Sequence, residues 1–86
     1  MKNLFSVSII FILLQFAVLA FADDFQDGLD AATQGDFKTA FKKWKPLAKR
    51  GSALAQFNMG LMYDKGEGVK RNYKKAARWY KLAAKQ

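Results

Sequence analysis

The chain has 86 residues, no cysteine, no histidine and a formal net charge of +8. Without cysteine and histidine it has no thiol nucleophile, no serine–histidine–aspartate triad, no attached haem and no zinc site of the usual ligand types. The sequence therefore indicates one small domain that is not an enzyme, and we assign it no catalytic residue, no metal site and no cofactor.

Residues 1–22 have the pattern of an export signal. Lys2 precedes an apolar run from Leu4 to Leu19, and the small residues Ala20 and Ala22 suit signal-peptidase cleavage. The run is barely long enough to span a bilayer. We therefore expect cleavage after Ala22 and a periplasmic or extracellular product, with retention of the segment as an anchor left open as the alternative.

The remaining sequence favours helices, because Ala, Lys, Leu, Gln and Met are abundant and proline occurs once. Four helices are predicted, near residues 24–34, 37–50, 53–64 and 73–86. Asp36, Ser52 and Asn72 stand where N-caps are expected. Gly51 and Gly66 are expected to end the helices that precede them in the left-handed conformation.

The four helices form two pairs that repeat each other. At an offset of 36 the matched pairs are Phe37 and Tyr73, Ala40 and Ala76, Trp44 and Tyr80, and Ala48 and Ala84. At an offset of 32 they are Phe25 and Phe57, Gly28 and Gly60, and Leu29 and Leu61. Each pair is therefore predicted to be a helical hairpin. A glycine inside a helix costs about 1 kcal/mol and needs a packing reason, so we expect Gly28 to face Ala40 and Gly60 to face Ala76.

These residues carry a family resemblance. The segments Ala55–Tyr63, Gly66–Val69, Ala76–Tyr80 and Ala83–Gln86 together resemble one Sel-one-like (Sel1-like) repeat, a relative of the tetratricopeptide repeats. The first hairpin, with Gly28, Ala40 and Trp44, is similar to the shorter tetratricopeptide form. Asn72 departs from the pattern, since an aspartate is usual there.

The resemblance implies an all-α solenoid of two stacked antiparallel hairpins behind the signal peptide. Residues 23–51 would form the tetratricopeptide-like hairpin and residues 52–86 the Sel1-like repeat. The positions expected to pack the repeats are Gly28, Ala40, Trp44, Gly60, Tyr63, Gly66, Gly68, Ala76 and Tyr80.

Charge is segregated along the chain: residues 23–36 contain five aspartates and no base, whereas residues 37–86 contain 14 bases and two acids. The bases recur at helical spacing on the second and fourth helices, at Lys38, Lys42, Lys45 and Lys49 and at Lys74, Arg78, Lys81 and Lys85. The outer layer of a tetratricopeptide-like stack would bring all eight side by side. This face is either solvated or attracted to an anionic membrane or envelope polymer.

The helix near residues 53–64 is apolar nearly all round, which is typical of a helix covered on both sides. With only two hairpins we expect an exposed apolar edge, made of Phe57, Leu61, Trp79 and Leu82. Such an edge favours capture of a partner or self-association.

Two functions follow from these observations. The first is an exported protein–protein interaction or adaptor module whose partner is an unidentified protein or peptide, or a second copy of the chain. The alternative is a small cationic protein that binds anionic lipid or envelope polymer. Export argues against nucleic acid as a partner.

Overall fold

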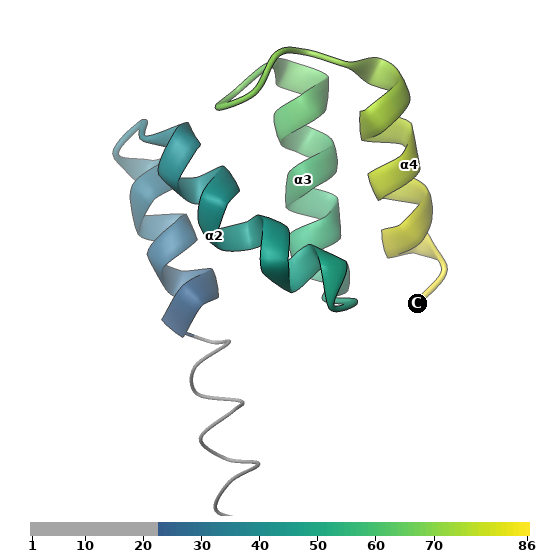
Figure 1. Cartoon of the computed structure of the whole chain (residues 1–86), viewed down its shortest axis with the longest axis horizontal. Helices are drawn as coiled ribbons and strands as arrows, with labels where there is room; N and C mark the ends of the chain where they lie inside the picture. The colour runs from purple at the N-terminus through teal and green to yellow at the C-terminus, as the bar shows by residue number, and fades with distance from the viewer. Residues whose placement is uncertain (1–22) are drawn as a thin grey trace, which may run out of the picture.

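The computed structural model describes residues 23–86, and the predicted export signal lies outside this range. The described chain is helical over residues 23–33 and in α2 (Phe37–Lys49), α3 (Ala53–Lys65) and α4 (Tyr73–Ala84), and it contains no strand (Figure 1). The all-α prediction is confirmed, with helix ends within two residues of those expected. Within this range no helix is long and apolar enough to cross a membrane.

All three predicted N-caps are confirmed. The side-chain oxygens of Asp36, Ser52 and Asn72 accept hydrogen bonds from the backbone N–H three residues later, at 3.2, 3.2 and 3.0 Å. Hydrogen bonds from Thr39 hold the pKa of Asp36 below its usual value because they favour the carboxylate. This cap therefore stabilises the fold at pH values above the usual aspartate pKa. The stabilisation is lost as the pH falls through the lowered pKa of Asp36.

The helices stack as two antiparallel hairpins, residues 23–33 with α2, and α3 with α4. The helix α3 packs against both α2 and α4, and α2 crosses in front of α3 in Figure 1. The buried core at this junction consists of Ala40, Trp44, Leu47, Ala48, Ala55, Met59 and Met62. It is therefore shared between the hairpins.

An aromatic ring lies against the helical glycine of each hairpin. A Cβ added at Gly28 would lie 2.6 Å from Cε2 of Trp44, and one added at Gly60 would lie 2.5 Å from Cδ1 of Tyr80. This corrects the expectation that the glycines face Ala40 and Ala76. Both alanines are buried, but the ring one helical turn further along supplies the atoms nearest to each glycine.

In each hairpin a phenylalanine also packs against this aromatic ring. The Trp44 indole N–H donates to the Phe25 carbonyl at 3.1 Å, and the two rings lie 5.8 Å apart. In the second hairpin the rings of Phe57 and Tyr80 lie 5.7 Å apart. The offsets of 32 and 36 residues thus relate equivalent side-chain contacts in the two hairpins as well as similar residue types.

The loop between α3 and α4 ties the second hairpin to the start of α2. Gly66 ends α3 with φ +70°, and Gly68 has φ +75°. A Cβ on Gly68 would lie 2.5 Å from the Phe37 carbonyl oxygen. Val69 packs against the core and Tyr63 is half-buried. The two loop glycines are therefore required both by backbone conformation and, at Gly68, by close contact.

Replacement of Gly60 by alanine is expected to destabilise the fold by about 1–3 kcal/mol, because the added methyl overlaps the Tyr80 ring. At an open helical site the same change would stabilise by about 0.5–1 kcal/mol. Denaturant unfolding of G60A, Y80A and the double variant measures the difference. If G60A lowers the free energy of unfolding equally with and without Tyr80, the Tyr80 ring does not restrict this position.

The titration of Tyr80 provides a second test. Partial burial, the 3.2 Å hydrogen bond from its hydroxyl to Asp64 and the charge of that carboxylate raise the pKa of Tyr80, because each disfavours the phenolate. Because the pKa of Tyr80 is higher in the folded chain than in the unfolded chain, the protonated hydroxyl stabilises the fold below about pH 10. This stabilisation is lost as the pH rises through the raised pKa.

Spectrophotometric titration should therefore show one of the three tyrosines ionising later than the others, and Tyr80→Phe should remove that last step. The thermal stability of the unaltered chain should also fall more steeply above pH 10 than that of Y80F. Loss of an earlier step in Y80F would show that the hydroxyl is solvated.

Candidate interaction surfaces

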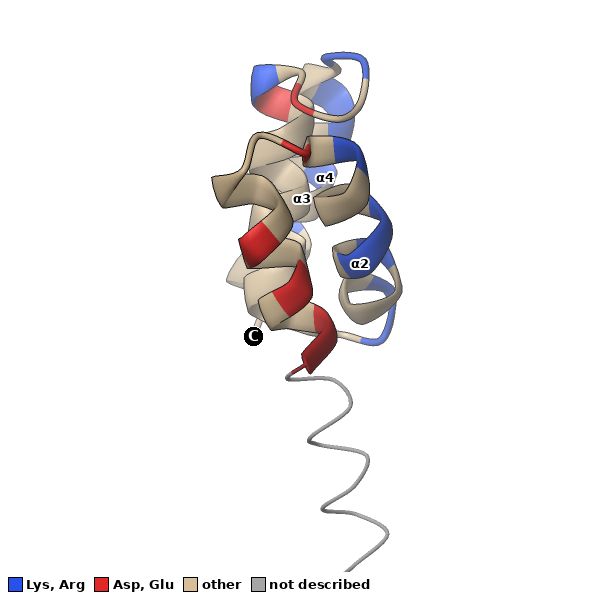
Figure 2. Cartoon of the chain, turned by 90° about the vertical axis from the view of Figure 1, so that its left-hand side faces the viewer, with Lys and Arg blue, Asp and Glu red and all other residues tan. Residues whose placement is uncertain are grey.

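The first hairpin of the described chain has an acidic and a basic helix. Figure 2 shows acidic residues along the helix over residues 23–33 and basic residues along α2, with further basic residues in the loop after α3 and on α4. Lys43 and Asp27 form a salt bridge of 3.8 Å between these helices. In the range 23–86 no cluster of acidic, cysteine or histidine side chains could hold a metal ion. The aspartates of the first helix are exposed or half-buried and give it a negatively charged surface.

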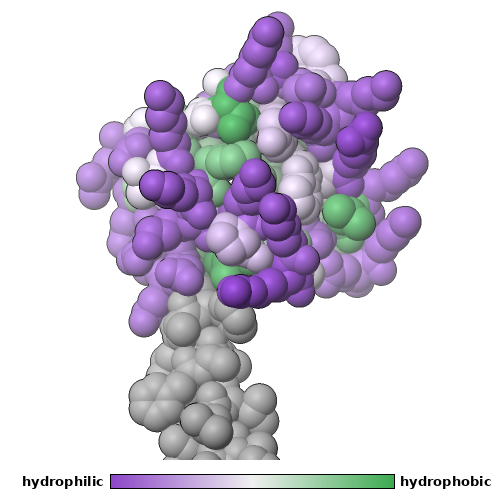
Figure 3. Space-filling model, in the orientation of Figure 1, coloured by the Kyte–Doolittle hydropathy of each residue, from purple (hydrophilic) through white to green (hydrophobic). Residues whose placement is uncertain are grey.

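Four of the five α2 lysines border an open groove of about 730 Å³. It is lined by Lys38, Thr39, Phe41, Lys42, Lys45, Pro46, Lys49 and Gly68. The Lys45 ammonium lies 5.6 Å from the centre of the Phe41 ring, a cation–π geometry. On the face drawn in Figure 3 the surface is mainly hydrophilic, with small separate apolar patches. Lys38, Lys42, Lys45 and Lys49 thus line one groove, as their helical spacing predicts.

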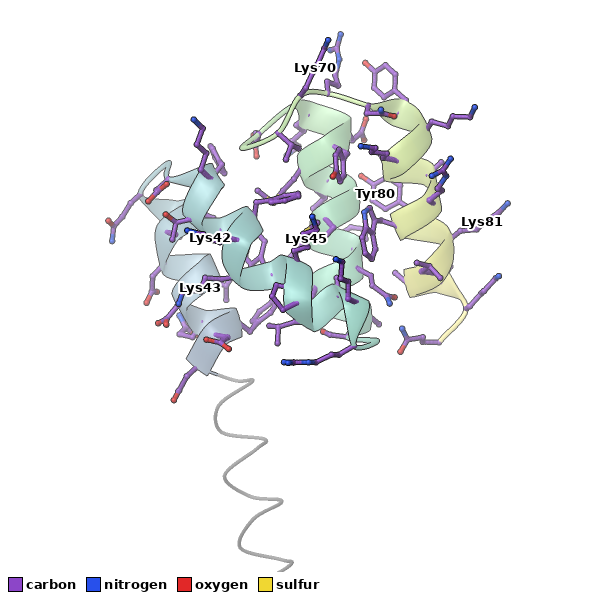
Figure 4. All side chains as sticks on the ribbon, viewed as in Figure 1. Lys42, Lys43, Lys45, Lys70, Tyr80 and Lys81 are labelled. Carbon is purple, nitrogen blue, oxygen red and sulfur yellow. The ribbon has the colours of Figure 1, made fainter. Side chains whose placement is uncertain are left out.

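The predicted union of these lysines with the α4 bases is wrong. The α4 bases are exposed, but α3 packs between the two helices and α2 crosses it at an angle. In Figure 4, Lys42 and Lys45 extend from the α2 side, whereas Lys81 points away from the body beyond α4. Helical spacing predicts a face on one helix but leaves open the rotation between two helices.

The predicted apolar edge is confirmed only in part. Phe57 and Leu82 are 46% and 44% exposed. Leu61 is half-buried, and Trp79 is half-buried and packs against the core instead of lying exposed. Trp79 packs against the core cluster that α2 and α3 share. Substituting Trp79 would therefore damage the core, and our expectation that it forms part of an exposed edge is wrong.

A shallow apolar groove of about 460 Å³ lies between α3 and α4. It is lined by Phe57, Tyr80, Ala83 and Ala84, and Tyr80 projects from α4 toward α3 in Figure 4. We call it the terminal groove. Of its four residues, only Phe57 was predicted as part of an edge, and Ala83 and Ala84 were missed.

The first hairpin has an equivalent surface that is covered. By the two repeat offsets, the terminal groove corresponds to Phe25, Trp44, Leu47 and Ala48. Trp44, Leu47 and Ala48 are 5%, 5% and 1% exposed, because α3 lies against them with Ala55, Met59 and Met62. Gln56 of α3 also donates to the Ala48 carbonyl at 3.0 Å. The offsets that revealed the repeat would have predicted the terminal groove as well.

Comparison with known proteins agrees with this architecture. Residues 53–86 match the Sel1 repeat family. The sel1-like repeat-containing proteins R815 and L18 of Acanthamoeba polyphaga mimivirus are 54% identical over 39 residues and 43% identical over 42 residues, which is 45% and 49% of this chain. The chitin synthase regulator SKT5 of Saccharomyces cerevisiae is 37% identical over 57 residues, or 66% of this chain.

These matches cover only 7%, 7% and 8% of the three relatives. No solved structure matches the chain. The family match spans α3, the glycine loop and α4, which are the elements that carry Gly60, Gly66, Gly68 and Tyr80. The hairpin of α3 and α4 therefore matches a Sel1 repeat, and residues 53–86 are the part of the chain that the family model covers.

Proposed function

We propose that this chain is an exported adaptor that binds another protein through the terminal groove. Sel1 repeats are protein–protein interaction modules, and a repeat scaffold contributes surfaces in place of reactive groups. The absence of cysteine and histidine from the sequence supports a binding role over a catalytic one. The lysines that line the α2 groove are secondary in this proposal. Unlike the terminal groove, the α2 groove has no counterpart in the molecule that is covered by another helix.

The observation that carries the proposal is the contrast between two equivalent surfaces. Trp44, Leu47 and Ala48 are buried under α3, whereas Tyr80 and Ala83 are half-buried and Ala84 is exposed. The ring of Phe57 adds an aromatic group at the mouth of the groove. Tyrosine, which Tyr80 contributes to the groove, is among the residues enriched in protein-binding hot spots.

Replacement of Phe57 by aspartate should reduce partner binding at least tenfold, because it puts a charge at the mouth of an apolar groove. Leu82→Asp is the matched control, since Leu82 is almost equally exposed but does not line the groove. Tagged chains carrying each change are compared by quantitative capture from the envelope and medium of the producing cells, after melting curves confirm folding.

One stoichiometric protein retained by the unaltered chain and by L82D, but lost by F57D, supports the groove as the binding site. Equal loss in both variants would point to non-specific hydrophobic capture. Undiminished capture by F57D would place the binding site elsewhere and overturn the proposal.

Export is supported by the pattern of residues 1–22. Expressed with its complete sequence, the chain should accumulate outside the cytoplasm with an intact mass that begins at Asp23. Ala20→Leu together with Ala22→Leu should block this processing, because signal peptidase requires small residues at its site. Recovery of the unaltered chain with Met1 still present would contradict cleavage.

A further inference from the structure

We infer that the partner inserts a helix into the terminal groove, and that the contacting face of this helix repeats the pattern by which α3 covers the first hairpin. This inference rests on the proposed function and adds the chemistry of the partner. The pattern is a small residue, an amide donor next to it, and methionine or a similar flexible apolar residue four and seven positions after the small residue, as in Ala55, Gln56, Met59 and Met62.

The covered surface of the first hairpin shows how such a helix fits. Ala55 and Met59 are fully buried and Met62 is 2% exposed, all in one cluster with Trp44, Leu47 and Ala48 of α2. The small Ala55 side chain lets α3 approach closely, and the flexible methionines fill the space around the rings. The contact is therefore specific in shape as well as apolar.

A polar contact fixes the register of this packing. The Ala48 carbonyl near the end of α2 accepts a hydrogen bond from the Gly51 N–H at 3.1 Å and a second one from the Gln56 amide at 3.0 Å. Gln56 is only 4% exposed. The equivalent carbonyl in the second hairpin belongs to Ala84, in the last turn of α4. A bound helix with a donor side chain at the position equivalent to Gln56 would make the same contact.

The two surfaces differ in one way that predicts a difference in the occupant. Ala83 stands where the first hairpin has Leu47, and Tyr80 stands where it has Trp44. Both changes reduce the side-chain volume, which leaves the terminal groove wider than its counterpart. The natural partner helix should therefore carry a larger apolar side chain than α3 at the position that meets Ala83.

A folded second copy of the chain is not the occupant in this proposal. The α3 face that has the required pattern is already buried against α2, with Ala55 and Met59 at 0% exposure. A second copy would have to unfold its own core to present that face. A partner that displays a comparable helix without this cost is favoured.

The test uses the peptide Ser52–Gly66 of this chain as the probe, titrated into the isotope-labelled full chain and followed by amide chemical shifts. We expect saturable shifts centred on Phe57, Ala83 and Ala84. The Met59→Asp peptide should not bind, and the Gln56→Leu peptide should bind at least fivefold more weakly because the donor is lost. Phe57→Asp in the chain should abolish the shifts.

A gain of binding separates this inference from simple damage to the groove. Ala83→Leu in the chain recreates the leucine that α3 meets in the first hairpin, so it should tighten binding of the α3 peptide at least threefold. Ala77→Leu is the matched control on an exposed position of α4 outside the groove, and it should leave the affinity unchanged.

Absence of saturable shifts, equal binding of the Met59→Asp peptide, or shifts confined to Trp44 and Ala48 would overturn the inference, the last because the peptide would then be displacing α3. Self-association of the chain that F57D abolishes would identify a second copy as the occupant and overturn it as well. If the peptide fails while F57D still removes the captured protein, the groove is the binding site but the α3 pattern is wrong.

Discussion

The fold depends on one contact, the aromatic ring that lies against a helical glycine in each hairpin. The Trp44 ring lies against Gly28 and the Tyr80 ring lies against Gly60. Each ring occupies the space that the side chain of any other residue at the glycine position would need. Ala40 and Ala76, one turn earlier on the same helices, are also buried. The same rings then form one wall of the surface against which the next element packs. The contact thus sets both the geometry of a hairpin and its capacity to bind a further helix.

Local features of the structure could be predicted from the sequence because their causes are local. The caps Asp36, Ser52 and Asn72 and the terminator Gly66 each depend on a few neighbouring residues. The internal offsets also correctly matched equivalent positions. What they left open was the rotation of each helix about its axis. For that reason Trp79 was wrongly placed on an exposed edge, and the bases of α2 and α4 were wrongly joined into one face.

The two grooves of the molecule differ in the forces that they offer a ligand. The α2 groove is bordered by four lysines, whose attraction to an anionic group is screened by salt and is small for exposed pairs. The terminal groove offers apolar area at about 25 cal/mol per Å² and a shape already used once within the molecule. Long-range charge can bring a partner to the protein, but specificity requires the second kind of surface.

The second hairpin holds α2 at both of its ends. Gly68 touches the backbone of Phe37 at the start of this helix, and Gln56 binds the Ala48 carbonyl near its end. An isolated first hairpin would have neither contact, and its Trp44 ring would be covered on one side only. The core is therefore complete only when both hairpins are folded, so the two hairpins acquire their final stability together.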